Sequence, residues 1–194
     1  MSSASLANWK NHRSLSLDEI ENALSHIYPR KKGGRRAQKS QSLNYSYLLL
    51  LSSEFQGFCR DIHTEGSLHI SLNVAPSLSK LIENLFGKHR KVDHGNPNPA
   101  NLAADFNQFG FDFWAALETS SKLNAGRRGQ IDDMVLWRNA IAHQDFDPIK
   151  KKFGQLTLYL DWVQRMRQAC EKLAEQIDKI LGEQLTTITG KNPW

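Results

Sequence analysis

The sequence has few of the features that mark secreted, membrane-spanning or metal-binding proteins. It contains only two cysteines in 194 residues, and no Cys/His cluster has the spacing of a zinc site. No apolar run approaches the roughly 20 residues that span a bilayer, since residues 48–51 are followed at once by Ser52, Ser53 and Glu54. The first residues have no apolar stretch typical of a secretory signal. These absences exclude a disulfide scaffold and a membrane-spanning helix, and the expected location is the cytoplasm.

The composition is that of an ordinary globular domain. Hydrophobic residues make up 40% and charged residues 23% of the chain, and its length suits one domain. Cys59 and Cys170 each fall on the apolar stripe of an expected helix, so we predict buried free thiols. His89 and His94 flank Asp93 without a third ligand at useful spacing. We therefore expect no metal site and no cofactor.

Apolar residues recur at alternating steps of three and four through most of the chain, which is the period of an amphipathic α-helix. The runs predict long helices over residues 44–63, 130–144 and 156–185, and shorter ones over 17–28, from Ser77 to Gly87, and over 99–109 and 112–124. Residues 68–74 alternate instead, which favours either a short strand or an irregular connection. The predicted fold class is all-α: an up-and-down helical bundle with short extra helices and at most one strand segment.

The predicted helices divide the chain into three parts. Residues 1–41 form an N-terminal extension with a short helix, started by the capping-box pair Ser16 and Glu19, and a basic loop. Residues 42–185 form the helical domain, and residues 186–194 form a tail. The last long helix carries an apolar seam from Val163 to Ile180 that suits either the bundle core or a subunit interface.

Part of the net charge of +5 is concentrated in residues 30–39, which contain several cations and no acid. Phosphate backbones are a common reason to keep like charges together. Lys31, Lys32, Arg35 and Arg36 are therefore candidate contacts for a nucleic acid. The alternative is a solvated loop that only aids solubility.

The most informative residues lie in LWRNAIAHQDF, at positions 136–146. A helix turns about 100° per residue, so Asn139 and His143 share a face and Arg138 lies to the side on a long stem. The Arg–His spacing alone arises by chance with a probability of order a third. The adjoining Asn139 and Ala142 in an amphipathic helix lower that expectation to roughly one in a thousand. Arg138, Asn139 and His143 are the candidate catalytic residues.

The stretch RNAIAH resembles the Arg-Asn-x-x-x-His signature of the HEPN superfamily, and the overall pattern is similar to RiboL-PSP-type HEPN proteins. Residues 46–62 resemble the first long helix of those domains, where an acidic residue lies among apolar ones; Glu54 holds that place. The resemblance covers about residues 42–182. It implies a metal-independent endoribonuclease, often a toxin or phage-defence effector, that works as a homodimer with both motifs facing one cleft and can be held by an antitoxin protein.

The resemblance also implies roles for the candidate residues. His143 would act as general acid or base, since an imidazole titrates near pH 6.5. Arg138 would stabilise charge on the phosphorane, and Asn139 would hold His143 or the phosphate. Glu54 would either support the site by orienting Arg138 or be a surface residue.

Two other interpretations stay open at this stage. In one, the chain is a catalytically silent HEPN module that binds RNA, a nucleotide or a partner protein. In the other, His143 hydrogen-bonds inside a helical scaffold and Arg138 pairs with Asp132 or Asp133. Arg60 is predicted to be an ordinary surface charge. Trp137 and Phe146 flank the motif and are predicted to pack in the core rather than stack on a base.

Overall fold

The computed structural model describes residues 1–27 and 41–194, and within them the chain is helical without a strand. The elements are α1 (Ala4–Asn8), a π-helical turn (Trp9–Arg13), α2 (Ser14–Ile27), α3 (Gln41–Leu72), α4 (Pro76–Lys88), α5 (Lys91–His94), α6 (Pro99–Phe106), a 3-10 turn (Asn107–Phe109), α7 (Phe113–Ser120), α8 (Leu123–His143), α9 (Asp147–Phe153) and α10 (Leu160–Thr189). The predicted all-α helical bundle is confirmed.

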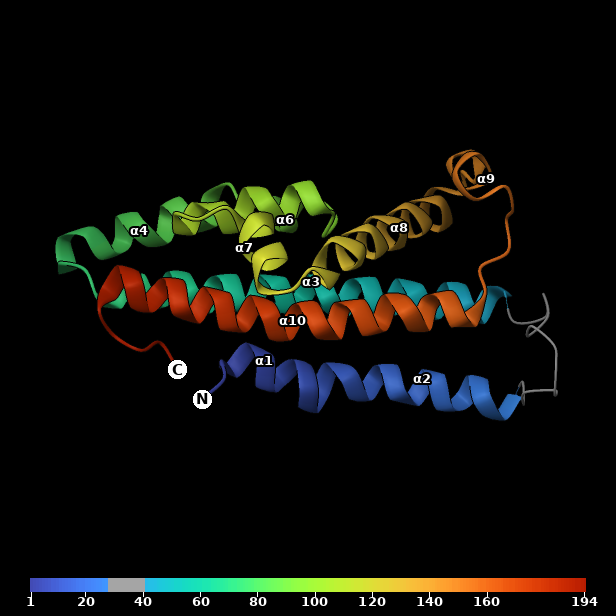
Figure 1. Ribbon diagram of the computed structural model, residues 1–194, viewed down its shortest axis with the longest axis horizontal. Coiled ribbons are helices and arrows are strands. Elements are labelled where there is room, and N and C mark those ends of the chain that lie inside the picture. The colour runs from blue at the N-terminus through green and yellow to red at the C-terminus, as the bar shows by residue number, and fades with distance from the viewer. Residues whose placement is uncertain (28–40) are drawn as a thin grey trace.

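The two longest helices, α3 and α10, lie side by side and form the centre of the bundle (Figure 1). The N-terminal helices α1 and α2 run along one side of this pair. On the other side, α4 packs against α3, and α8 packs against both α3 and α10. No helix in the described part of the chain is long and apolar enough to cross a bilayer.

The N-terminal helix is longer than the sequence pattern predicted. It begins at Ala4, where the Ser3 hydroxyl accepts a hydrogen bond from the Leu6 amide at 2.9 Å, and it continues through the π-helical turn to Ile27. Ser16, predicted as its cap, is an exposed residue inside the helix. Leu6 and Trp9 are buried in the same core as α3, and this apolar burial stabilises the first turns.

The expected strand or irregular connection at residues 68–74 is instead helical through Leu72. Ile70 is buried, while Leu68 and Leu72 on either side of it are exposed. The alternation that suggested a strand therefore reflects one buried position and two solvent-facing leucines. The helix stays close to its neighbours because Gly66 lies against Phe109 and Leu181, where a Cβ would come within 3.2 Å.

The apolar seam of α10 faces the core of its own protomer. Val163, Cys170 and Leu173 are fully buried in the cluster formed with α3 and α8. Cys59 and Cys170 are both free and buried, as predicted. The seam therefore stabilises the bundle and does not provide a subunit interface.

Helix α8, which carries the candidate motif, starts earlier than predicted and includes Gly126 and Gly129 in its first turns. Ile131 and Met134 are fully buried and Ile141 is nearly so, as the pattern indicated. Ala142 is exposed. Its position beside His143, in the last turn, places it on the solvent side of the helix.

Candidate active site

The three motif residues occupy about the last two turns of α8, and the helix stops directly after them. Gln144 adopts a left-handed conformation with φ 56°, and its side-chain Nε2 donates to the Ile141 carbonyl at 2.7 Å. The Asp145 amide donates to the Ala140 carbonyl at 3.1 Å. These bonds satisfy carbonyl groups that the helix end leaves without partners. His143 is therefore the last residue of a firmly terminated helix.

Asn139 is the centre of a short polar chain. Its Oδ1 accepts a hydrogen bond from Asn96 Nδ2 at 2.6 Å and another from Arg138 Nη1 at 3.2 Å. Both donors contact the same oxygen, so the Asn139 amide group Nδ2 points the other way. That Nδ2 makes no hydrogen bond with the described residues and remains a donor for a ligand.

The loop that carries Asn96 is fastened to α3. Gln56 Nε2 donates to the carbonyls of Val92 at 2.6 Å and Gly95 at 2.8 Å. The Arg60 guanidinium also donates to the Val92 carbonyl and contacts Asp93 at 3.2 Å. Arg60 lies on the helix surface, as predicted, with its side chain 40% exposed, and it also holds this loop in place.

A buried carboxylate fixes the other side of the loop. Asp105, fully buried, accepts hydrogen bonds from the amides of Lys91 at 2.6 Å and Val92 at 2.9 Å. Burial raises the pKa of Asp105 above its usual value, although the two amide bonds act in the opposite direction. Asp105 thus positions α5, and through it Asn96, against the end of α8.

Arg138 is half-buried and has no carboxylate partner among the described residues. The acids that could have neutralised it are engaged elsewhere. Lys152 of α9 contacts Asp133 at 2.6 Å and Asp132 at 3.4 Å. The guanidinium of Arg138 therefore keeps its charge and most of its donors for a ligand.

His143 is exposed, and its imidazole makes no hydrogen bond or ion pair with residues 1–27 or 41–194. The interpretation in which it hydrogen-bonds inside the bundle does not fit this placement. The structure brings Arg138 and Asn139 into contact and leaves His143 one turn further along, with its ring open to solvent. Such a side chain can meet a substrate or a second subunit.

Glu54 lies apart from this polar chain. Its carboxylate contacts Nη1 of Arg13, in the π-helical turn, at 2.6 Å, while Nη2 of the same arginine contacts Asp61 at 2.9 Å. Gly57 lies directly beneath this guanidinium, where a Cβ would come within 2.5 Å of Nη1. Glu54 therefore holds Arg13 and the N-terminal helices, and it makes no ion pair with Arg138 within the described residues.

The remaining sequence candidates take structural positions or fall outside the described chain. Trp137 is fully buried and stacks on Phe153, and Phe146 stacks on Tyr45 at 5.8 Å, as core residues were predicted to do. No group of three or more potential metal ligands occurs in the described part of the chain. The candidate nucleic-acid contacts Lys31, Lys32, Arg35 and Arg36 lie outside the described residues.

Sequence reasoning missed Asn96, Asp105 and Arg13. Asn96 lies between two predicted helices, where the sequence predicts no functional residue, although its partner Asn139 lies in the motif. The signal available was the density of asparagines and prolines in residues 95–99. Asn98 is one of these, and its side chain caps α6 by accepting from the Asn101 amide at 2.8 Å.

Comparison with known proteins identifies a family. No curated protein and no solved structure matches the chain. A family model described as RiboL-PSP-HEPN matches residues 15–183, which is most of the chain and includes α3, α8 and most of α10. The chain therefore belongs to the RiboL-PSP-HEPN family.

Proposed function

We propose that this HEPN protein is a metal-independent endoribonuclease and that Arg138, Asn139 and His143 are its catalytic residues. One observation carries the proposal. The end of α8 presents a guanidinium without a carboxylate partner, an amide with a free donor, and an exposed imidazole, while Asp132 and Asp133 are paired with Lys152. A structural role would instead use these groups in contacts inside the protein.

The chemistry of RNA cleavage matches these three groups. The 2′-hydroxyl attacks the adjacent phosphorus, the bond from phosphorus to the 5′-oxygen breaks, and a 2′,3′-cyclic phosphate and a 5′-hydroxyl result. One proton must leave the 2′-oxygen and another must reach the 5′-oxygen. An imidazole can do either, typically for a factor of about 100 to 10,000. Arg138 and the Asn139 Nδ2 donate hydrogen bonds to the phosphorane oxygens, where negative charge develops.

A homodimer supplies what one protomer lacks. Each chain carries a single motif histidine, whereas the reaction uses both an acid and a base. Arg138 and His143 are also about 140° apart around their helix axis, so they do not converge within one chain. We propose that a two-fold axis brings both copies of the motif to one cleft, where the two His143 side chains divide the proton transfers.

The biological role we propose is that of a toxin or phage-defence effector that acts on RNA in the cytoplasm and is restrained by an antitoxin protein. The second candidate is a catalytically silent HEPN module that binds RNA, a nucleotide or a partner protein. The unpaired Arg138 also suits phosphate binding without cleavage, which is the observation that favours this candidate.

The experiment that separates the two candidates is incubation of the full chain with a structured RNA in EDTA. We expect cleavage that leaves 2′,3′-cyclic phosphate ends and is abolished by His143→Ala. The matched control is His89→Ala, because His89 is also exposed but lies at the end of α4. Wild-type protein that binds RNA without cutting it would favour the silent module. Equal activity in both variants would refute the role of His143.

A further inference from the structure

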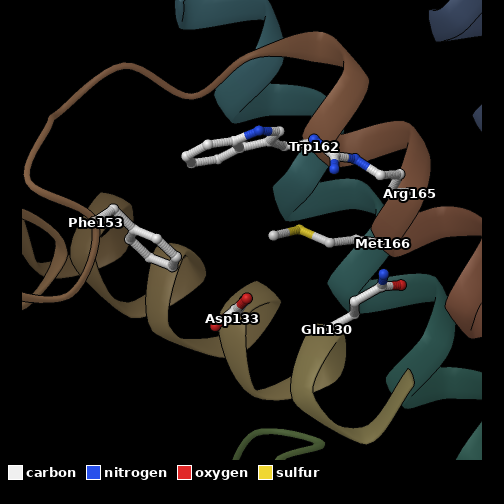
Figure 2. Close-up of a pocket in the computed structure, with 6 residues that line it drawn as sticks. All are labelled: Gln130, Asp133, Phe153, Trp162, Arg165 and Met166. Carbon is white, nitrogen blue, oxygen red and sulfur yellow. The ribbon is translucent and has the colours of Figure 1, made fainter. Parts of the chain in front are cut away.

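A pocket of about 260 Å³ opens between α8 and α10, away from the motif (Figure 2). Its lining consists of Gln130, Asp133, Phe153, Trp162, Arg165 and Met166. Figure 2 shows side chains from both helices and from α9 converging on it, with the Met166 thioether at its base. Ligand sites commonly combine an apolar floor with a few polar groups of this kind.

The apolar side of the pocket is aromatic. Phe153 and Trp162 are half-buried, and their ring centroids lie 5.5 Å apart at an angle of 48°. Phe153 is held from behind by Trp137, whose ring stacks on it at 6.0 Å. The Trp162 ring contacts Tyr159 edge-on at 5.7 Å. The two aromatic rings are therefore fixed by packing and keep part of their surface open to the pocket.

The polar side of the pocket has unused hydrogen-bonding groups. The Gln130 amide makes no hydrogen bond with the described residues. Asp133 meets Lys152 through Oδ1 at 2.6 Å, and its Oδ2 accepts no hydrogen bond in the described part of the chain. The amide and the carboxylate oxygen can hydrogen-bond the edge of a nucleobase, while the aromatic rings can stack on its face.

The pocket continues into a second hollow along the same two helices. Gln130 and Arg165 line both hollows, and the second one also carries Arg127 and Lys172. The one acid that lines the second hollow, Glu171, is paired with Arg167 at 2.9 Å. Arg165 contacts Asp161 at 3.5 Å and Lys172 contacts Glu175 at 3.0 Å, but both pairs are exposed and weak, so a phosphate can replace the carboxylates. Cations along a groove that ends in aromatic rings are the usual arrangement for single-stranded nucleic acid.

We propose that this pocket holds one unstacked nucleobase of the RNA strand, while Arg127, Arg165 and Lys172 contact its phosphates. This proposal rests on the proposed function, because it requires that the chain binds RNA. Asp133 and His143 are ten residues apart in α8, which is about 15 Å along the helix. A stacked strand covers that distance in about four nucleotides, so the pocket reads a base a short way from the cleaved bond.

The Asp133 carboxylate also gives the pocket a preference among the four bases. Asp133 Oδ2 can only accept a hydrogen bond while the carboxylate is ionised. The exocyclic amino groups of adenine, cytosine and guanine can donate to it, whereas the N3–H of uracil lies between two carbonyl oxygens that repel the carboxylate. The pocket therefore prefers an amino-bearing base to uracil, and this preference depends on Asp133.

The test measures binding without cleavage. Fluorescently labelled seven-nucleotide strands of adenine, cytosine or uracil carry 2′-O-methyl groups, which remove the attacking hydroxyl, and anisotropy gives their Kd. We expect Trp162→Leu to raise the Kd for the adenine strand about 5- to 150-fold, the range for one stacked base, and Trp162→Phe to restore most of the affinity. Asp133→Asn should bring the Kd values of the adenine and uracil strands closer together. The matched control is Trp194→Leu, because Trp194 packs on Gly182, far along α10 from the pocket.

Each outcome decides the proposal. Protein that binds the strands equally well after Trp162→Leu refutes the base pocket but leaves the nuclease proposal standing, since His143→Ala and RNA cleavage test that separately. A change of oligomeric state in Trp162→Leu, seen by sedimentation, would assign the pocket to a protein interface and refute the base-binding proposal. If Trp162→Leu does not fold, Gln130→Ala and Asp133→Asn carry the test. Wild-type protein that binds none of the strands also overturns the proposal.

Discussion

The hydrogen bond between Asn96 and Asn139 offers a sharp test of the active-site geometry. Asn96→Asp replaces the donor group Nδ2, 2.6 Å from Asn139 Oδ1, with an oxygen of nearly the same size. Two acceptors would then face one another. Either the Asn139 amide turns over and donates to the new carboxylate, or Arg138, which now contacts Asn139 at 3.2 Å, turns towards that carboxylate instead. Both responses withdraw a donor from the phosphate.

The size of the effect follows from the bonds involved. Asn96→Ala removes one neutral hydrogen bond, worth about 0.5–1.5 kcal/mol, which corresponds to about a 2- to 13-fold loss in kcat/KM if the bond serves only to orient Asn139. Asn96→Asp creates a charge-assisted bond that competes with the substrate. Such a bond is worth about 1.5–3 kcal/mol, so we expect a loss of about 10- to 150-fold.

Single-turnover cleavage of a labelled RNA in EDTA measures this loss. Asn98→Asp is the matched control in the same loop, because Asn98 acts as the N-cap of α6 and aspartate serves equally well there. We expect the cleavage rate to be highest in the wild type and in Asn98→Asp, lower in Asn96→Ala and lowest in Asn96→Asp. Full activity in Asn96→Asp, or a larger loss in the alanine variant, would refute the assignment of Asn139 as a donor to the phosphate.

Two further predictions concern buried titratable groups. Burial lowers the pKa of His63 from 6.5 to about 4. As the pH drops from 6.5 towards 4, the unfolded chain is therefore protonated at this residue before the folded chain is, and the free energy of unfolding falls. Relative to a His63→Leu variant, chemical denaturation should show that the wild-type protein loses about 2 kcal/mol of unfolding free energy between pH 7 and pH 5. An equal pH dependence in both proteins would contradict it. Burial also raises the pKa of Cys59 and Cys170, so a chromogenic thiol reagent should label neither in the native chain and both in denaturant. Rapid native labelling would show that the core opens.

The parts of the fold that follow from local patterning could be predicted from the sequence. The apolar repeats of α3, α8 and α10 gave their existence and most of their buried faces, because a helical period is visible in consecutive residues. The motif could be located for the same reason, since Arg138, Asn139 and His143 lie on one helix. Helix ends were less predictable: Ser3 and Ser16 are both plausible caps, and burial of Leu6 and Trp9 decides between them.

Contacts between distant segments could not be predicted in this way. Asn96 reaches Asn139 only because Gln56, Arg60 and Asp105 hold the intervening loop, and no periodic signal marks such a group. Glu54 was expected to orient an arginine of the motif, yet the arginine beside it, Arg13, comes from the N-terminal helices. A carboxylate on an amphipathic helix shows that a cation is needed but not which segment provides it.

The close approach of Arg13 to Gly57 has a consequence for how this sequence can change. The guanidinium occupies the space that a methyl group at position 57 would need, and from there it binds both Glu54 and Asp61. A mutation of Gly57 to a larger residue therefore makes the end of the Arg13 side chain shift, which disturbs its contacts with both carboxylates. These four positions are thus coupled in space, so that a change at Gly57 reaches Glu54 and Asp61 through a residue of another helix.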